Sequence, residues 1–217
     1  MWGLGAEAGR PAAGRLITLA ALAAAAIVGF GIPAASTRPL PAKPVPPGPS
    51  GTARPTAAWS AFCLQHPGEC AVDRAEPEIV PFTPQVLAAL TAVNRSVNRA
   101  IVPVPDLEHW GVTDRWDFPD DGRGDCEDIQ LLKRRLLAER GLPRRAMRMT
   151  VVINGKGEGH AVLTVRTSRG DLILDNARDD VLPPRRTGYA FVKREGSDGR
   201  AWVWLDGTSA PVVTTAR

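Results

Sequence analysis

The chain has 217 residues, a formal net charge of +4 at pH 7 and a pI near 9.3. This length accommodates one ordinary domain with extensions. The densest group of basic residues lies between Lys133 and Arg148 and has no interleaved aromatic residues. Base stacking on nucleic acid needs such aromatic residues. We therefore interpret the basic group as a solvated surface and expect no nucleic-acid partner.

Residues 1–35 are predicted to be a signal peptide or a membrane anchor. Arg10 and Arg15 precede an apolar run over residues 16–32, and small residues follow at 33–36. This order is typical of a secretory signal with its cleavage site. A spanning helix needs about 20 apolar residues, so the shorter run favours a cleaved signal over a retained anchor. In both cases we expect a periplasmic or exported protein. If the segment is retained as an anchor, it is the only membrane contact that we expect.

Residues 36–58 are predicted to be a proline-rich linker. The segment is crowded with Pro, Gly, Ser and Ala, as in Pro44-Val45-Pro46-Pro47. This composition lacks the apolar side chains of a core and favours an extended tether. The folded domain is expected at residues 59–207, followed by a short tail at residues 208–217.

The cysteines also favour export. Cys63 and Cys70 form a close pair, whereas Cys126 stands alone. In an oxidising compartment the pair is expected to form a disulfide and to leave one odd thiol. The alternative is a metal site that includes His66, although a closed zinc site needs a fourth ligand.

Two long helices are predicted in the first part of the domain. Thr83-Pro84 supplies a helix cap and a first-turn proline, and apolar residues recur at helical spacing up to residue 100. A long irregular stretch over residues 102–124 follows, and loops of that length usually line a site. The second helix is expected to begin near Asp125 and to end at Gly141.

After the second helix the apolar pattern changes from a helical to a strand-like period. Helices followed by a run of strands indicate an α+β fold, with the N-terminal helices packed on an antiparallel β-sheet. The predicted strands cover residues 146–153, 160–166, 171–175, 189–193 and 201–205.

Cys126 lies at the expected first turn of the second helix, between Asp125 and Glu127. Free backbone N–H groups and the helix dipole stabilise a thiolate at this position, whereas the flanking carboxylates oppose it. An activated thiol therefore needs a nearby imidazolium, or carboxylates that are engaged elsewhere. The alternative is a structural cysteine, but burial for packing is unexpected in so polar a segment.

His160 and Asp175 lie at the start and the end of two neighbouring predicted strands. If the turn between them has an even number of loop residues, residue 162 pairs with Asp175. Both side chains then lie on one sheet face, about 7–8 Å apart at the backbone. The carboxylate fixes the imidazole tautomer, and the other ring nitrogen faces the thiol. The remaining histidines, His66 and His109, are weaker candidates.

These segments resemble the bacterial transglutaminase-like cysteine peptidases. The resemblance rests on Gly124-Asp125-Cys126-Glu127-Asp128, Gly159-His160-Ala161-Val162-Leu163 and Leu174-Asp175-Asn176, which occur in this order at similar spacing. It extends over Trp59–Leu205 and includes Thr187-Gly188-Tyr189-Ala190-Phe191. It implies a papain-like or transglutaminase-like fold.

The resemblance implies an exported cysteine endopeptidase with Cys126 as nucleophile, His160 as base and Asp175 as the group that orients the base. Hydrolysis then proceeds through an acyl-enzyme, with the Cys126 backbone N–H as an oxyanion donor and Trp116 shaping the cleft. The group includes a periplasmic protease that clips surface adhesins. The expected partner is therefore a protein or peptide substrate, with a surface adhesin as the candidate.

The resemblance also suggests calcium. Adhesin-clipping members bind calcium near the catalytic cysteine, and Asp125 and Glu127 match acidic positions there. Carboxylate oxygens suit this hard cation, whose charge offsets their effect on the thiolate. The alternative is a capping charge at the helix terminus, and the chemistry itself is expected to need no cofactor.

Two other functions remain open from the sequence. The same triad serves transglutaminases, which transfer an acyl group to an amine. A catalytically idle domain of this fold would instead bind a peptide or a signalling partner.

Overall fold

The structure is a computed structural model that describes residues 49–205. The predicted signal or anchor, residues 1–35, lies outside the described residues, as do the first part of the linker and the C-terminal tail. Within residues 49–205, no helix has both the length and the apolar character needed to span a bilayer.

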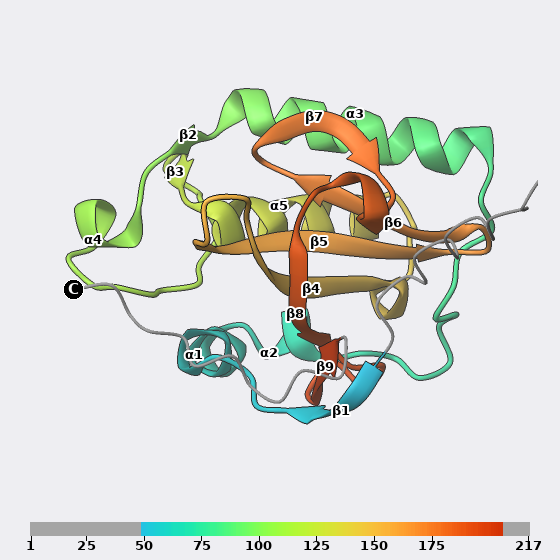
Figure 1. Ribbon diagram of the computed structural model, residues 1–217, viewed down its shortest axis with the longest axis horizontal. Helices are drawn as coiled ribbons and strands as arrows, with labels where there is room; N and C mark the ends of the chain where they lie inside the picture. Colours follow the sequence, from blue (N-terminus) through green and yellow to red (C-terminus); the bar gives the residue numbers. More distant parts are fainter. Residues whose placement is uncertain (1–48, 206–217) are drawn as a thin grey trace, which may run out of the picture. The chain divides into compact units, whose positions relative to one another are not determined.

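An antiparallel sheet forms the centre of the domain (Figure 1). Its strands are β1 (Pro49–Ala53), β4 (Met147–Ile153), β5 (Gly159–Thr167), β6 (Gly170–Asp175), β7 (Arg178–Leu182), β8 (Ala190–Glu195) and β9 (Trp202–Leu205). The seven strands follow the order β1-β9-β8-β4-β5-β6-β7, and every neighbouring pair is antiparallel. The predicted antiparallel sheet after the long helices is confirmed.

The two edge strands differ from the sequence prediction. β1 lies in the segment predicted as a linker, yet it pairs with β9 and buries Ala53. An edge strand needs ladder hydrogen bonds on one side only, so a composition rich in Pro and Gly does not prevent it. β7 was not predicted because it starts with Arg178-Asp179-Asp180, which hides any apolar alternation.

Five α-helices precede or lie beside the sheet in the described residues: α1 (Ala57–Gln65), α2 (Pro67–Cys70), α3 (Pro84–Ala100), α4 (Asp106–His109) and α5 (Cys126–Glu139). Short 3₁₀ turns are η1 (Arg144–Ala146) and η2 (Pro184–Arg186), and β2 (Val102–Pro103) pairs in parallel with β3 (Arg123–Gly124). α3 and α5 are the two predicted long helices, and both are confirmed.

Local sequence explains how α3 begins and why it packs. The Thr83 hydroxyl accepts a hydrogen bond from the Val86 N–H at 3.2 Å, which satisfies one free donor of the first turn. Leu90, Val93 and Val97 form its buried stripe. α3 packs beside α5 and over β7, while α5 packs on β5 (Figure 1).

The main core lies between the helices and the sheet. Leu163 and Leu174 from the sheet join Ile129 from α5 and Leu90 from α3 in one buried cluster. Strand side chains that point to the other face of the sheet form a second, smaller cluster. Its buried members are Val152, Val162, Ile173, Phe191 and Leu205.

Cys63 and Cys70 form the predicted disulfide, which joins α1 to α2. The alternative of a metal site with His66 is therefore wrong, because the bond uses both thiols. The His66 ring instead packs against Phe62 and Phe118, with ring centroids 4.7 and 5.3 Å away.

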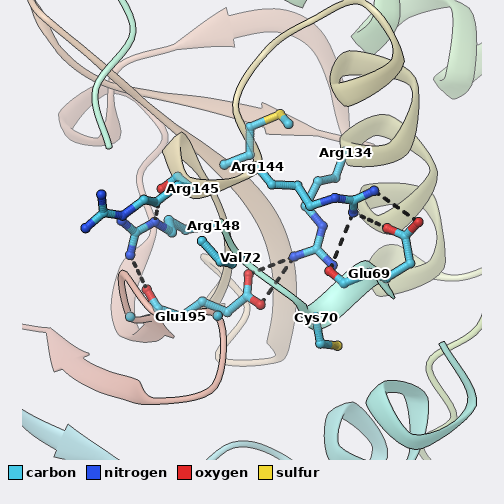
Figure 2. A pocket seen from close by; sticks show the side chains of 11 residues that line it. Glu69, Cys70, Val72, Arg134, Arg144, Arg145, Arg148 and Glu195 are labelled. Carbon is cyan, nitrogen blue, oxygen red and sulfur yellow. Dashed lines mark hydrogen bonds and ion pairs between the residues drawn. The ribbon is translucent and has the colours of Figure 1, made fainter. Parts of the chain in front are cut away.

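Next to this disulfide lies a buried group of ion pairs that we call the arginine cluster (Figure 2). Arg134 on α5 donates to both oxygens of Glu195, at 3.2 and 3.0 Å. The Met149 N–H donates to the same carboxylate at 2.7 Å. The charged members of the cluster are Glu69, Arg134, Arg144, Arg145, Arg148 and Glu195. It ties α2, α5, β4 and β8 together. Lys133, Arg134 and Arg148 are buried, so the expectation that the basic group is a solvated surface is wrong for these three residues.

Candidate active site

Cys126 is the first residue of α5, as the sequence predicts. Gly124 allows β3 to approach this helix closely, because a Cβ there would lie 2.9 Å from the Asp128 Cβ. Asp125 occupies the N-cap position, but its carboxylate makes no capping hydrogen bond. The Ala161 N–H on β5 donates to the Cys126 Sγ at 3.3 Å. The thiol therefore lies where the start of α5 meets the start of β5.

His160 and Asp175 lie close together across the β5–β6 hairpin. The pairing of Leu163 with Leu174 and of Thr167 with Gly170 leaves an even, two-residue turn. The same register aligns residue 162 with Asp175, so the predicted common face is confirmed. The His160 Nε2 lies 2.9 Å from the Asp175 Oδ1.

Asp175 is held from several sides. The Ala177 N–H donates to its Oδ1 at 2.9 Å, and the Tyr189 hydroxyl donates to its Oδ2 at 2.6 Å. Burial raises the pKa of Asp175, but the hydrogen bonds from His160, Tyr189 and Ala177 outweigh burial, and the net pKa is lowered. A carboxylate that stays ionised is suited to hold the imidazole.

The thiol and the imidazole line one open cleft of about 230 Å³. Because the Nε2 of His160 faces Asp175, its Nδ1 is the nitrogen left for another partner. Trp116, the sequence candidate for shaping the cleft, is a buried part of its wall. Asp114 lies beside it, so the irregular stretch after α3 does line the site. The other lining residues are Thr56, Glu127, Val151, Gly159 and Ala161.

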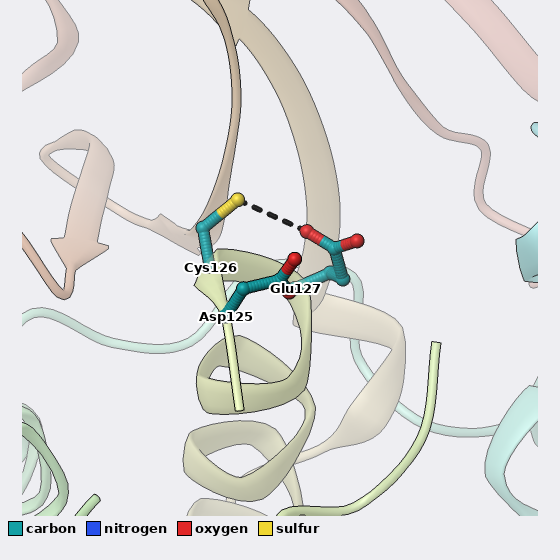
Figure 3. A group of neighbouring side chains, drawn as sticks. All are labelled: Asp125, Cys126 and Glu127. Carbon is teal, nitrogen blue, oxygen red and sulfur yellow. Dashed lines mark hydrogen bonds between the residues drawn. The ribbon is translucent and has the colours of Figure 1, made fainter. Parts of the chain in front are cut away.

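Figure 3 shows the Cys126 thiol directed toward Glu127. The Sγ donates to the Glu127 Oε2 at 3.0 Å. Burial raises the pKa of Cys126 well above its ordinary value, and the Glu127 and Asp125 carboxylates raise it further. As predicted from the sequence, these flanks oppose a thiolate. This arrangement therefore favours the protonated thiol over the thiolate.

The flanks belong to a larger group of acidic residues that we call the carboxylate cluster. Its oxygen atoms form overlapping sets within 4.8 Å of one another. The cluster consists of Asp106, Asp114, Asp125, Glu127 and Asp128. The sequence resemblance predicts a metal role only for Asp125 and Glu127. The other members were missed, although the irregular stretch is visibly rich in Asp.

The carboxylate cluster has the electrostatics of a cation site. Burial and the neighbouring carboxylates raise the pKa of Asp125 to about 6. Burial raises the pKa of Asp128 to about 8, with a further contribution from Asp125. One buried oxygen of Asp106 and one of Asp125 have no hydrogen-bond partner among residues 49–205. Carboxylates in this state fit a hard divalent cation, which would satisfy the free oxygens and cancel the repulsion.

The other histidines lie outside the cleft. His66 is 3.4 Å from the Asp117 carboxylate, and His109 is 2.8 Å from the Asp121 carboxylate. Neither residue lines the cleft that contains Cys126. His160 is therefore the histidine that the structure brings to this cysteine.

Several solved structures are similar to the chain. Legionella pneumophila LapG shares 24% sequence identity over 67% of this chain and 76% of that chain, with a TM-score of 0.47. Its calcium-bound form shares 23% identity over 73% and 82%, also with a TM-score of 0.47. An EGTA-treated form shares 24% over 67% and 74%, with a TM-score of 0.46. No curated protein matches the chain.

The profile of one protein family, described as bacterial transglutaminase-like cysteine proteinase, matches residues 49–210. This range holds the whole sheet, both long helices and the cleft. The resemblance seen in the sequence is confirmed, together with the transglutaminase-like α+β fold. The chain therefore belongs to the bacterial transglutaminase-like cysteine proteinases and is a cysteine peptidase.

Proposed function

We propose that the protein is an exported endopeptidase that cleaves a protein substrate through an acyl-enzyme on Cys126. The observation that carries this proposal is the 2.9 Å contact between His160 Nε2 and Asp175 Oδ1, made by a histidine that shares a cleft with the thiol. Asp175 fixes the tautomer and the orientation of the ring. The Nδ1 of His160 is then free to act on Cys126.

The proposed reaction has two halves. His160 takes the thiol proton, and the Cys126 sulfur attacks the carbonyl carbon of the scissile peptide bond. The bond to nitrogen breaks, the amine leaves with the proton from His160, and a thioester remains. Water, deprotonated by His160, then hydrolyses the thioester to a free acid and restores the thiol. The Cys126 backbone N–H, at the start of α5, is the proposed oxyanion donor.

We assign a cation-binding role to the carboxylate cluster, with Asp125 and Glu127 as the ligands next to Cys126. Calcium bound there would supply positive charge that lowers the thiol pKa and competes for the Glu127 oxygen that now accepts from Sγ. The chain's own residues still carry every proton and bond of the reaction. The cation thus adjusts the reactivity of the nucleophile.

Export and the substrate class follow from chemistry and from the family. The Cys63–Cys70 disulfide is typical of proteins that fold in an oxidising compartment such as the periplasm. A peptidase of this family acts on a protein. Among protein substrates we propose a surface adhesin, the substrate class that the sequence resemblance implies.

The test is the reactivity of Cys126 with iodoacetamide between pH 5 and 9, with calcium and with a chelator, followed by mapping of the labelled residue. An activated thiol reacts well below the ordinary thiol pKa of about 8.5, and calcium should increase the rate at low pH. His160→Ala should abolish the reaction at low pH. His66→Ala is the matched control, because that ring lies outside the cleft and packs against Phe62 and Phe118. An inert Cys126 in the calcium-loaded protein would contradict the proposal.

Two further measurements separate the alternatives. Hydrolysis of a protein substrate is compared with incorporation of a labelled amine into a glutamine donor, which reports acyl transfer. Cys126→Ala should abolish the biological activity. If that variant keeps full activity, the domain acts as a binding module and the enzymatic proposal is wrong.

A further inference from the structure

Tyr189 contacts both members of the His160–Asp175 pair. Its hydroxyl donates to the Asp175 Oδ2 at 2.6 Å. Its ring meets the His160 ring edge to face, with centroids 5.6 Å apart and planes at 73°. One half-buried side chain thus limits the motion of the imidazole and of the carboxylate together.

The two oxygens of Asp175 have separate sets of partners. Oδ1 receives the Ala177 N–H and faces the His160 ring, while Oδ2 receives the Tyr189 hydroxyl. The Arg178 Nε lies 3.3 Å from Oδ2. Rotation about the last bond of an aspartate is otherwise broad and nearly two-fold. Donors on both oxygens therefore fix the carboxylate plane and direct Oδ1 at the imidazole.

Tyr189 is itself placed by the turn before β8. Gly188 has a φ of 77°, a left-handed conformation that glycine adopts without strain. The Tyr189 N–H donates to the Thr187 hydroxyl oxygen at 3.2 Å, and the Thr187 hydroxyl donates to the Pro184 carbonyl at 2.8 Å. Arg178 donates to the Tyr189 hydroxyl oxygen at 3.3 Å. The phenol is therefore fixed by its backbone and by its far end.

The phenol stays a proton donor across the working pH range. Burial raises the pKa of Tyr189, and the hydrogen bond to Asp175 raises it further. The hydroxyl therefore donates to Asp175 and does not compete with it as a second anion.

We propose that Tyr189 is a positioning residue, whose hydroxyl sets the orientation and basicity of Asp175 and whose ring holds His160 in place for Cys126. This inference rests on the proposed function. Tyr189 touches neither the thiol nor the substrate in this scheme, and it acts through the other two residues. Sequence spacing alone assigns it no role.

The first experiment compares Tyr189→Phe with Tyr189→Leu in the calcium-loaded protein. Tyr189→Phe removes one strong hydrogen bond to a charged group, so kcat should fall about tenfold with KM changed less than about twofold. Without this donor the carboxylate becomes more basic and stabilises the imidazolium. The imidazole limb of the pH–rate profile should therefore move to higher pH. Tyr189→Leu also removes the aromatic ring, so its kcat should fall further, by about a hundredfold relative to wild type.

The matched control is Thr150→Val, which removes another buried hydroxyl, 2.7 Å from the Thr164 hydroxyl and outside the cleft. It should leave the pH–rate profile unchanged. A merely structural role for Tyr189 predicts lower activity in proportion to lost folded protein, with no displacement of either limb. That result, or wild-type kinetics in Tyr189→Phe, would overturn the inference.

The chain offers a second test that leaves the fold intact, because Tyr189 is its single tyrosine. Biosynthetic replacement by 3-fluorotyrosine changes only this residue: fluorine replaces one ring hydrogen beside the hydroxyl, which becomes a stronger donor. The imidazole limb should then move to lower pH, opposite to Tyr189→Phe. Displacement in the same direction for both, or none for the fluorinated protein, would overturn the inference.

A double-mutant cycle separates this inference from the proposed function. The readout is the rate of Cys126 alkylation by iodoacetamide, which remains measurable in slow variants. In Asp175→Ala, adding Tyr189→Phe should lower the alkylation rate by no more than about twofold, because the carboxylate that accepts from the Tyr189 hydroxyl is already absent. A full tenfold cost there would overturn the inference. If wild-type Cys126 is inert, the proposed function fails; if it reacts and Tyr189→Phe reacts equally, only the role of Tyr189 fails.

Discussion

The arginine cluster (Figure 2) and the carboxylate cluster, of which Figure 3 shows Asp125 and Glu127, hold their charges in opposite ways. In the arginine cluster, burial raises the pKa of Glu195, and Arg134, Met149 N–H and Arg148 oppose that effect. In the carboxylate cluster, burial raises the pKa of Asp125, and the nearby Asp106 raises it further. One cluster contains its own counter-charges, whereas the other is made of like charges.

This difference separates a structural role from a functional one. Breaking a buried ion pair is destabilising, because removal of one partner leaves the other charge buried and uncompensated. A group of carboxylates, most of them buried, stores repulsion that a cation or a proton relieves. Cys126 lies within the second group, so its thiol pKa responds to whatever occupies the carboxylate cluster.

The largest expected effect on the free energy of unfolding comes from breaking the arginine cluster. Arg134→Met leaves the buried Glu195 without its bidentate partner, so the free energy of unfolding should fall by about 3–5 kcal/mol. Arg95→Ala is the control, because its pair with Asp180 is exposed and contributes about 0–1 kcal/mol. Urea denaturation measures both. Equal losses in the two variants would show that burial does not decide the contribution of these ion pairs.

Lys133 is a buried cation without a paired carboxylate in the described residues, so its removal should stabilise the fold, whereas removal of Arg134 destabilises it. Lys133 is fully buried, its Nζ has no hydrogen-bond partner among residues 49–205, and burial lowers its pKa to about 7. Since the ordinary value is 10.5, the folded protein binds fewer protons than the unfolded chain between pH 7 and 10.5. The free energy of unfolding contributed by Lys133 therefore rises with pH over that window.

Lys133→Met removes this penalty and should raise the free energy of unfolding by about 1–4 kcal/mol at pH 7. The gain over wild type should shrink toward pH 10, where the wild-type lysine is largely neutral in the folded state. Lys156→Met, at an exposed turn, is the control and should change little at either pH. A gain that stays the same at pH 7 and pH 10 would contradict the burial argument.

Calcium should act on the carboxylate cluster alone. With a chelator present, Asp125 and Asp128 keep protons in the folded protein up to about pH 6 and 8, while the unfolded chain loses them near 3.8. The folded state then binds more protons than the unfolded state, so their contribution to the free energy of unfolding falls as pH rises from about 4 to 8. A bound cation favours the ionised carboxylates and should reverse this loss.

We therefore expect calcium at one hundred times its Kd at pH 8 to stabilise the fold by about 2.7 kcal/mol at that pH. The same calcium concentration should stabilise the fold by less at pH 5, where protons compete for the carboxylates. Thermal unfolding with calcium and with a chelator measures the difference. Asp125→Asn should remove most of it. Asp120→Asn, on an exposed carboxylate paired with Arg135, should keep it. Equal stabilisation at both pH values would show that calcium does not bind this cluster.

The features that could be predicted from the sequence are those that depend on residues close together along the chain. α3 follows from its cap at Thr83 and one apolar stripe, and the β5–β6 register follows from a two-residue turn. Because that register is local, the approach of His160 to Asp175 could be expected from the strand pattern and the turn alone. The position of Cys126 at the start of α5 is local in the same sense.

Contacts between distant segments could not be predicted in this way. Asp106 and Asp114 join the carboxylate cluster only because the irregular stretch folds back over the start of α5. Asn94 on α3 accepts a hydrogen bond from the Asp175 N–H across 81 residues of sequence. Neither contact leaves a periodic pattern in the sequence, since both depend on how the layers pack.

The smallest expected effect concerns the covalent link beside the arginine cluster. The Cys63–Cys70 disulfide closes a loop with a sequence separation of 7. In the chain-entropy description, its removal by the double replacement Cys63→Ser and Cys70→Ser should lower the free energy of unfolding by about 2 kcal/mol. Glu69 lies next to Cys70 and receives hydrogen bonds from Arg134 and Arg144.

The disulfide and Arg134 therefore restrain the same segment, and their effects should couple. Adding Arg134→Met to the double-serine variant should cost less than the same replacement in wild type, because α2 is already loosened. Alkylation of Cys126 in the calcium-loaded protein should keep its rate, since neither change touches the carboxylate cluster. If loss of the disulfide slows Cys126 alkylation tenfold while the protein remains folded, the two charged regions are linked and the division between them is wrong.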